Sequence, residues 1–471
     1  MRQGSIVLFF LLIVISGCKK LVEIDAPVSS VNQDNVYSND ATAISVLTGI
    51  YTVMSAPGSV LSGSSGISMR VGLSADEWAL SENVNDDKLI AYYRNALSIN
   101  TSSGSEFWEP LYKFVFYANS AIEGLSNSST LTASVKSQLL GEARFVRAFS
   151  YFYLVNLFGD LPLVTSTDYN QNLQLTRSPK EKVYELIVSD LKEAIGILSS
   201  NYLNGSLQRY AGGSERVRPT KWAAIALLSR VYLYTGDFDN AELQSSILID
   251  NSALFSLPGL KDVFLKNNAE AIWQLQPTSN GWNTEDARFF VVNNVPGNDK
   301  PVFLSESLLN AFETGDNRRS SWVRDTAIES DTVFYAYKYK SATFDDPVTE
   351  YQSVLRLGEQ FLIRSEARAQ KNNISGAQSD LNVIRRRAGL SDTQAGDKEG
   401  LLRAILQERR IELFSEWGHR WFDLKRTKQI DNVMSIVALL KGGQWESFKQ
   451  LYPIPFIDIE RNSKLIQNSG Y

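Results

Sequence analysis

A pattern of two antiparallel helices between residues 219 and 250 constrains the fold more than any other feature of this sequence. Small residues let the two helices approach closely, and aromatic residues fill the gaps between neighbouring hairpins. The positions that form the pattern are Ser229, Tyr232, Gly236, Phe238 and Ala241. This spacing predicts a scaffold that is built from helical hairpins.

Other segments extend the helical pattern along the chain. Residues 141–158 place aromatic side chains on one helical face, with Gly159 as a stop, and Ser178 to Glu181 resemble a capping box that opens the next helix. A second hairpin over 357–388 fits more loosely. We therefore expect a mainly α fold, a tetratricopeptide-like scaffold of a few divergent helical hairpins.

Two stretches interrupt the helical pattern. Residues 55–105 are rich in Ser, Gly and Asn, which predicts a long, partly ordered loop. Residues 251–350 form a loop-rich insertion, in which 270–275 and 333–339 have the character of short strands. Because long loops in compact domains are often functional, we expect both stretches to bind ligand within one domain over 41–471.

The first residues predict export and lipid anchoring. A basic residue precedes an apolar run over 6–15, which is too short for a permanent membrane-spanning helix. Residues 15–18 then read Ile-Ser-Gly-Cys, the pattern of a lipobox. We expect a lipoprotein signal peptide over 1–17, a diacylglycerol on Cys18, and a lipid anchor and tether over 18–40. The alternative is an ordinary signal peptide or an anchor helix, with Cys18 there by chance.

Composition excludes several classes of function. Cys18 is the only cysteine, so the mature chain forms no internal disulfide, and removal of Arg2 changes the formal charge from −5 to −6. This charge gives no reason to expect a nucleic-acid partner. A single histidine, His419, rules out a multi-histidine metal site. We expect no metal or cofactor, while catalysis by carboxylates alone stays open.

Four motifs then appear in order along the chain. The first runs from Glu142-Ala143-Arg144-Phe145 to Phe158-Gly159-Asp160-Leu161-Pro162. The second contains Ser365-Glu366-Ala367, Asn382-Val383-Ile384-Arg385 and Arg387-Ala388-Gly389. The third contains Glu408-Arg409-Arg410-Ile411-Glu412-Leu413 and Arg420-Trp421-Phe422-Asp423-Leu424-Lys425-Arg426. The last are Pro453-Ile454-Pro455 and Gln467-Asn468-Ser469-Gly470-Tyr471. Together they resemble the SusD/RagB family, with Ser469 in place of that family's usual proline.

The resemblance covers nearly the whole mature chain. It implies an outward-facing outer-membrane lipoprotein that captures nutrients, usually glycans, and partners a SusC-like TonB-dependent transporter. It also implies no catalytic activity. Residues 55–105 and 251–350 match no family motif closely, so the resemblance does not supply the identity of the ligand.

Three glutamates spaced by four residues, Glu408, Glu412 and Glu416, lie on one helical face and would repel one another unless paired. Nearby residues that could neutralise them are Arg409, Arg420 and Arg385 to Arg387. We favour an ion-pair network over a carboxylate pair for glycoside hydrolysis, because adjacent arginines keep carboxylates ionised. We expect His419, beside this network, to be structural.

Three tryptophans lie in a polar loop context: Trp78, Trp282 and Trp322. An exposed ring covers the apolar C–H face of a sugar, and polar side chains bond the hydroxyl groups. The polar residues expected to do so are Asp76, Asn83, Arg94 and Asn283. For any single ring, anchoring a loop to the scaffold is an equally good interpretation. We expect at least one of the three to contact ligand.

The sequence therefore predicts a cell-surface protein that binds an oligosaccharide. Two alternatives from other classes stay open. One is a surface glycoside hydrolase that uses paired carboxylates, and the other is a repeat scaffold that binds peptides.

Overall fold

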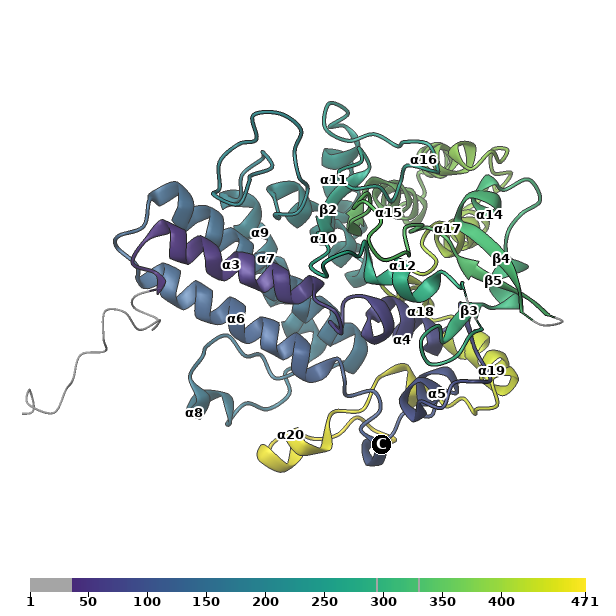
Figure 1. Cartoon of the computed structure of the whole chain (residues 1–471), viewed down its shortest axis with the longest axis horizontal. Helices are drawn as coiled ribbons and strands as arrows, with labels where there is room; N and C mark the ends of the chain where they lie inside the picture. Colours follow the sequence, from purple (N-terminus) through teal and green to yellow (C-terminus); the bar gives the residue numbers. More distant parts are fainter. Residues whose placement is uncertain (1–35, 294, 329–330) are drawn as a thin grey trace, which may run out of the picture.

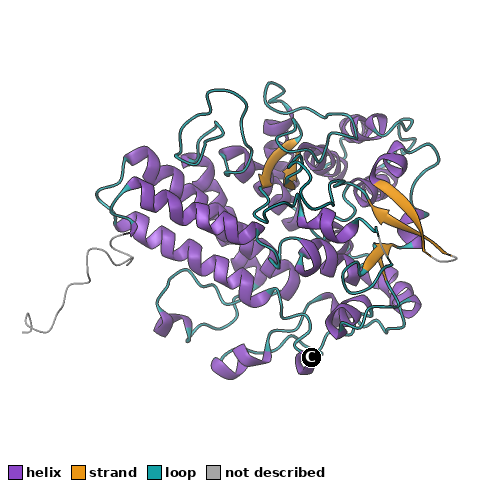
Figure 2. Ribbon diagram, in the orientation of Figure 1, coloured by secondary structure: helices purple, strands orange, loops and turns teal. Residues whose placement is uncertain are grey.

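The computed structural model describes residues 36–293, 295–328 and 331–471. The predicted signal peptide, Cys18 and nearly all of the tether lie outside these residues. The described chain is mainly helical, and its strands form small two-stranded sheets (Figure 2). The predicted fold class is therefore confirmed.

The scaffold is a series of long helices packed side by side (Figure 1). Its members are α3 (Asp40–Ser55), α6 (Trp108–Asn127), α7 (Ala133–Phe158), α9 (Lys180–Ile197), α10 (Lys221–Thr235), α11 (Phe238–Ile249), α15 (Leu357–Gln370), α16 (Ile374–Arg387) and α17 (Lys398–Glu412). α7 packs between α6 and α9, with α3 across it. Because α7 has neighbours on several sides, Phe145, Phe149, Phe152 and Tyr153 are all buried.

Both predicted hairpins are present as α10–α11 and α15–α16. In the first, Gly236 adopts a left-handed φ of 76°, which ends α10, and the Asp237 side chain accepts from the Asn240 amide to begin α11. The small residues Ser229 and Ala241 are completely buried, as close helix packing requires. α11 also packs on α15, so the two hairpins continue one scaffold.

The beginning of α9 differs from the prediction. The helix starts at Lys180, and the Ser178 side chain does not cap it. Instead, the Asp160 carboxylate accepts a hydrogen bond of 2.9 Å from the Lys180 backbone amide. The backbone of Ser178 pairs with that of Leu161 in an isolated β-bridge, which holds this residue extended.

The stretch over 55–105 is more ordered than expected. It contains η2 (Gly63–Ser65), α4 (Ile67–Ser74), β1 (Trp78–Leu80), α5 (Asp87–Tyr93) and η3 (Ile99–Thr101). α4 has no polar face because nearly all of its residues are buried, including Ser68 and Ser74. A helix that is buried on every side shows no amphipathic periodicity in its sequence.

The insertion over 251–350 carries the remaining strands. They are β2 (Ala271–Leu275), β3 (Val302–Leu304), β4 (Val323–Ile328), β5 (Asp331–Ala336) and, just after the insertion, β6 (Gln352–Arg356). The antiparallel pairs are β1–β3, β2–β6 and β4–β5, so the two predicted strand regions are present as β2 and β5. β2 and β6 pair with Ala271 opposite Arg356 and Leu275 opposite Gln352, through a bulge. The insertion therefore leaves the scaffold and returns to it at one small sheet.

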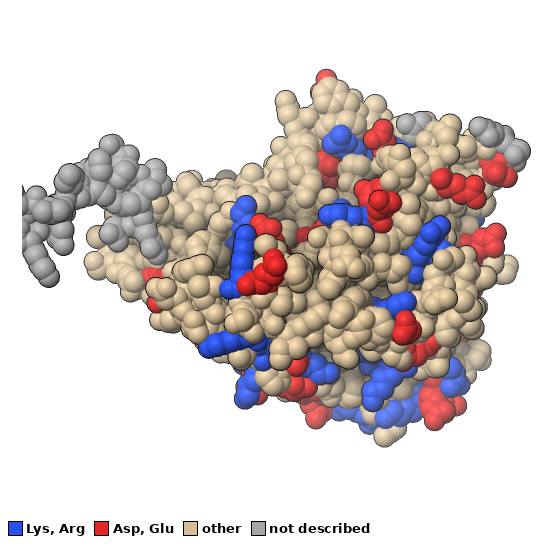
Figure 3. Space-filling view, turned by 90° about the horizontal axis from the view of Figure 1, so that it is seen from below, with Lys and Arg blue, Asp and Glu red and all other residues tan. Residues whose placement is uncertain are grey.

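Shorter helices complete the described chain. They are α8 (Tyr169–Asn172), α12 (Glu285–Phe290), α13 (Glu306–Leu309), α14 (Asn317–Trp322), α18 (His419–Arg426), α19 (Ile430–Leu440), η4 (Ser447–Gln450) and α20 (Phe456–Arg461). On the face seen from below, acidic and basic side chains are interspersed among uncharged surface (Figure 3). No broad field of one charge covers that face.

Candidate functional site

Two of the three predicted sugar platforms are buried. Trp78 is 1% exposed, lies 4.7 Å from the Phe290 ring between centroids, and donates to the Ser68 carbonyl at 3.0 Å. A Cβ atom at Gly72 would lie 2.6 Å from the Trp78 Nε1 atom, so this glycine makes room for the indole. The predicted exposed setting of Trp78 is wrong, because α4 and α12 enclose the ring.

Trp322 is also buried, with 0% of its surface exposed. Its Nε1 donates to the Leu260 carbonyl at 2.8 Å, and its ring packs edge-on against Phe264 at 5.5 Å. The ammonium group of Lys338 lies 4.8 Å from the ring centroid. The predicted exposure of Trp322 is therefore also wrong, and the ring is part of the core beneath the insertion.

Two of the predicted polar ligands are fully occupied inside the protein. Asp76 is buried and pairs with Arg420 at 2.7 Å and with Arg410 at 2.8 Å. Burial by itself raises the pKa of Asp76, but Arg420 and Arg410 outweigh it and hold the pKa well below its usual range. Asn283 is buried and accepts from the backbone amides of Thr349 and Glu350 at 2.8 and 3.0 Å. The prediction that Asp76 and Asn283 bind sugar hydroxyl groups is therefore wrong, because both side chains are buried and bonded within the protein.

Asn83 and Arg94 are exposed, but they lie apart from the predicted platforms. Asn83 donates to the Pro296 carbonyl at 3.1 Å, which ties the 55–105 stretch to the insertion. The backbone carbonyl of Arg94 lies against Gly443, where a Cβ atom would come within 1.9 Å. In the described chain, no hydrogen bond or ring contact joins either residue to Trp282.

Trp282 is the predicted ring that keeps an exposed surface. It is half-buried and makes an edge-on contact of 5.6 Å with Phe344, a residue that the sequence argument missed. Phe344 is 59% exposed, so this ring and that of Trp282 together present an aromatic surface to solvent. The guanidinium group of Arg288, on α12, lies 4.8 Å from the Trp282 ring. These residues form an aromatic surface, the Trp282–Phe344 platform.

The platform is held in place from two sides. Gly281 has a φ of 76°, and a Cβ atom there would lie 2.6 Å from the Phe344 ring, so glycine permits the close contact. On the other side, the Gly63 amide donates to Asp286 at 2.8 Å and docks the 55–66 loop on α12. Both predicted ligand-binding stretches therefore meet at α12, although through residues that were mostly not predicted.

The three spaced glutamates lie in an ion-pair network, as predicted, but the arrangement differs in two respects. Arg409 and Arg420 pair with Asp423 and Asp76 instead of with the glutamates, and Glu416 lies beyond the end of α17. Arg318 contacts Glu408 at 2.6 Å and Glu412 at 2.9 Å, while Arg356 contacts Glu412 at 2.7 Å and Glu416 at 2.8 Å. Additional pairs are Arg387–Glu412, Lys338–Glu416, Arg356–Glu270, Arg387–Glu270 and Arg385–Glu408. The network ties α14, α16, α17 and β6 together.

The charges of the network are set by opposing effects. Burial alone raises the pKa values of Glu412 and Glu416, but the surrounding guanidinium and ammonium groups outweigh burial and hold both below their usual range. Glu408 is the exception, because burial raises its pKa above the usual range in spite of Arg318. Since Glu408 is 2% exposed, its carboxyl group has no open surface toward a substrate.

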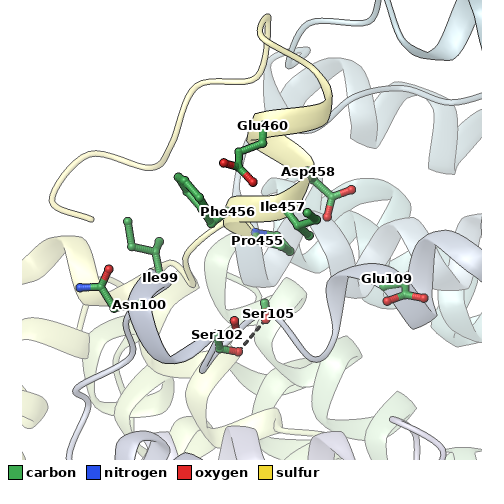
Figure 4. A pocket seen from close by; sticks show the side chains of 10 residues that line it. All are labelled: Ile99, Asn100, Ser102, Ser105, Glu109, Pro455, Phe456, Ile457, Asp458 and Glu460. Carbon is green, nitrogen blue, oxygen red and sulfur yellow. Dashed lines mark hydrogen bonds between the residues drawn. The ribbon is translucent and has the colours of Figure 1, made fainter.

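A separate pocket of about 450 Å³ lies between η3 and α20 (Figure 4). Ile99 and Phe456 face it from opposite sides, and Asp458 and Glu460 supply acidic groups. Phe456 is 52% exposed. In Figure 1, α20 lies at the lower edge of the molecule, well away from α12. This pocket is therefore a second exposed aromatic site, distinct from the platform.

Comparisons with known proteins decide the family. Residues 71–233 match a family described as starch-binding and associating with the outer membrane, and residues 282–471 match the SusD family. The chain belongs to the SusD/RagB family. SusD-like protein P2 of Formosa agariphila is 27% identical over 426 residues, covering 78% of this chain and 80% of the relative.

Solved structures of SusD-like proteins share the fold. A SusD superfamily protein from Bacteroides vulgatus superimposes with a TM-score of 0.77 at 21% identity, covering 92% of this chain and 99% of the other. A laminarin-binding SusD-like protein has a TM-score of 0.75 at 22% identity, covering 92% and 100%. Surface glycan-binding protein A from Bacteroides fluxus has 0.76 at 21% identity, covering 91% and 99%. In this SusD-family chain, no described helix is both long and apolar enough to cross a bilayer.

A buried acid next to Asp76 predicts a pH-dependent stability. Burial, and then the charge of Asp76, raise the pKa of Glu77 to about 8, and its Oε1 atom is buried without a hydrogen-bond partner. Unfolded glutamate titrates near pH ~4.3, so the native state alone keeps this proton between about pH 4 and pH 8, and stability falls as the pH rises through that range. We expect the stability of Glu77→Gln relative to wild type to increase by about 3 kcal/mol between pH 5 and pH 8.

Urea unfolding of Glu77→Gln and wild type between pH 5 and pH 8 measures this difference. Glu82→Gln, at an exposed position five residues later, is the matched control and should leave the profile unchanged. A difference between Glu77→Gln and wild type that does not grow with pH would show that Glu77 is not protonated in the native state.

Proposed function

We propose that this SusD-family protein is a lipid-anchored, outward-facing outer-membrane protein that binds an oligosaccharide at the Trp282–Phe344 platform and delivers it to a SusC-like TonB-dependent transporter. The observation that supports this proposal most directly is the 59% exposure of Phe344 beside the half-buried ring of Trp282. Two relatives of similar fold are named for laminarin and surface-glycan binding, which supports a glycan as the ligand class.

The chemistry of the platform suits a sugar. Aromatic rings stack on the apolar C–H face of a pyranose, while charged and polar groups beside them bond its hydroxyls. Arg288 lies over the Trp282 ring and pairs with Glu285 at 3.6 Å, so donor and acceptor groups adjoin the rings. Ser279, which donates to Glu285 at 3.0 Å, adds a hydroxyl group to the same rim.

We favour a binding function over glycoside hydrolysis. A glycosidase needs two accessible carboxyl groups about 5–10 Å apart, one of them a proton donor. Glu408, Glu412 and Glu416 are each at most 5% exposed and engaged in ion pairs. Release of reducing ends from a polysaccharide panel would favour the hydrolase, and a binding protein should release none.

The binding experiment is isothermal titration of the protein, purified in detergent, against a panel of polysaccharides and oligosaccharides. We expect Trp282→Ala and Phe344→Ala each to weaken binding of the recognised glycan about five- to thirtyfold, because one stacked ring contributes about 1–2 kcal/mol. Phe456→Ala is the matched control, since Phe456 is a similarly exposed phenylalanine on another part of the surface. Loss of binding in Phe456→Ala alone would move the site to the pocket of Figure 4.

The membrane anchor is tested separately, because Cys18 lies outside the described residues. We expect Cys18→Ala to shift the protein from the membrane fraction to the soluble fraction, since the diacylglycerol would supply the stable attachment. Fractionation followed by immunoblotting measures this shift. Continued sedimentation of the variant with membranes would contradict the lipobox.

The transporter is tested by co-purification in mild detergent. We expect a β-barrel protein of the TonB-dependent class to copurify with the tagged protein from its native host. Repeated isolation of the tagged chain alone would count against delivery to such a transporter.

A further inference from the structure

A cavity of about 1080 Å³ lies on a part of the protein that the platform does not use. It lies where the end of α7, the first turns of α9, the end of α10 and the end of α18 meet. Three sequence motifs converge there, through Gly159 and Asp160, Lys425 and Arg426, and Asn468. Its volume is that of a small-molecule site.

Lys425 lines this cavity without a carboxylate partner. Its ammonium group donates to the Asn156 carbonyl, and no ion pair in the described chain includes it. Some buried cations of this protein have carboxylate partners, such as Arg230 with Glu359 at 2.6 Å and Lys338 with Glu416 at 2.5 Å. Lys441 resembles Lys425, since it is buried and donates to the backbone carbonyls of Leu73 and Ala75. A buried cation that lacks such a partner is energetically costly unless an anion reaches it.

Two more cations line the same cavity. Lys180, at the first position of α9, has no ion pair within the described residues and an exposed side chain. Arg177 donates only to oxygen atoms of neutral groups, among them the Asp160 carbonyl at 2.9 Å and the Asn468 side chain at 2.5 Å. The cavity therefore gathers positive charge from three segments.

Within the described residues, the acidic side chains of the lining form no ion pair with these three cations. Asp160 accepts from the Lys180 backbone amide, Asp237 caps α11, and Glu185 pairs with Lys182 at 2.7 Å. Arg426 is itself neutralised by Glu366 and Asp423. Glu181, on the exposed side of the first turn of α9, is the remaining acid of the lining.

The groups around Lys425 reflect its lack of an ion-pair partner. Burial, and then the charge of Lys180, lower the pKa of Lys425 to about 7, so the two lysines are close enough to repel. The Tyr234 hydroxyl, in the same lining, is buried without a hydrogen-bond partner. The Tyr184 hydroxyl contacts the Asn156 side chain at 3.1 Å. An anion beside Lys425 would offset the repulsion between the lysines.

We propose that this cavity binds an anionic sugar residue, with its carboxylate or sulfate ester held by Lys180 and Lys425. The anionic group rests on the unpaired lysines, and the choice of a sugar rests on the proposed function. Hydroxyl groups of the ligand find partners in Tyr184, Tyr234 and Asn156. The site differs from the platform in position and in chemistry, since the platform offers aromatic rings and the cavity offers ammonium groups.

The test is titration of the full-length protein in detergent with D-glucuronate, D-galacturonate and D-glucose 6-sulfate. D-Glucose, D-galactose and inorganic sulfate are the reference ligands. We expect an anionic sugar to bind better than its neutral counterpart and better than sulfate. Lys425→Gln and Lys180→Gln should each weaken that binding about tenfold or more, because a charge-assisted hydrogen bond is lost.

The matched control is Lys192→Gln, which changes an exposed lysine of the same helix that does not line the cavity. It should leave affinity unchanged, and Lys425→Arg should retain binding because it keeps the charge. The proposal is overturned if the anionic sugars bind no better than the neutral ones or than sulfate. It is equally overturned if Lys192→Gln weakens binding as much as Lys180→Gln does.

Two further results separate this proposal from the proposed function. Trp282→Ala should leave binding of the anionic monosaccharide intact, which locates that binding away from the platform. If glycans bind at the platform while no ligand depends on Lys180 or Lys425, only the cavity proposal fails. Thermal unfolding checks that Lys425→Gln is folded, and Lys180→Gln, at an exposed position, carries the test if it is not.

Discussion

Glu412→Ala is expected to lower the free energy of unfolding by about 3–5 kcal/mol. Glu412 is completely buried, and its carboxylate is shared by Arg318, Arg356 and Arg387. Removing the carboxylate leaves buried guanidinium groups with fewer partners and opens a cavity between α14, α16 and β6. Because its neighbours hold the pKa of Glu412 below the usual range, its contribution is present above about pH 4 and is lost as the pH falls further.

Urea unfolding at pH 7 measures this effect. Glu399→Ala is the matched control, because Glu399 is on the same helix, is 88% exposed in its side chain, and contacts Arg403 at only 3.9 Å. An exposed pair of this kind contributes less than about 0.5 kcal/mol. Equal stability of Glu412→Ala and Glu399→Ala would mean that the network does not hold these helices together.

Trp78→Ala is expected to destabilise the protein by about 3–5 kcal/mol, as truncation of a buried aromatic side chain does. The ring fills the space between α4 and α12, where it contacts Phe290 and the Ser68 carbonyl. Alanine leaves that volume empty, and Gly72 on the facing helix has no side chain to fill it. Trp78→Phe should cost less, because it keeps most of the packing and loses mainly the hydrogen bond.

The comparison with Trp282→Ala sharpens this prediction. Both residues are tryptophans from loop sequences, but Trp282 is half-buried and Trp78 is 1% exposed. Chemical denaturation should show a large loss of stability for Trp78→Ala and a small one for Trp282→Ala. Glycan affinity, in contrast, should fall more in Trp282→Ala than in Trp78→Ala. A stable Trp78→Ala variant that no longer binds glycan would return Trp78 to the ligand site.

The helical scaffold could be predicted because its signals are local. Gly236 ends one helix and Asp237 begins the next within two residues, and the small positions Ser229 and Ala241 repeat at helical spacing. Such signals depend on neighbours in the sequence, so the α10–α11 hairpin is recognisable without knowledge of what packs on it.

The candidate site could be predicted only in outline, because burial of its residues depends on distant partners. Trp322 stands in a polar stretch, yet Leu260 and Phe264 from another loop enclose it. Asp76 pairs with Arg420, 344 positions away. The network also takes Arg318, 94 positions from Glu412, which no helical spacing could identify. One sequence feature could have identified Phe344 as an exposed ring. It is a lone aromatic residue within the polar sequence Thr-Phe-Asp-Asp-Pro.

The pairing of β2 with β6 has a consequence for how proteins of this shape diversify. Leu275 and Gln352 face each other across the sheet, so the 76 residues between Gln276 and Tyr351 form a closed excursion with adjoining ends. The entropy of closing a loop grows only slowly with its length. A change in the length of its exposed loops therefore leaves the ends anchored. The inner contacts have to be kept, among them Lys338 and Arg318 in the network and Phe290 against Trp78. A lineage can alter what it captures by changing the loops of this one segment while it inherits the helical frame.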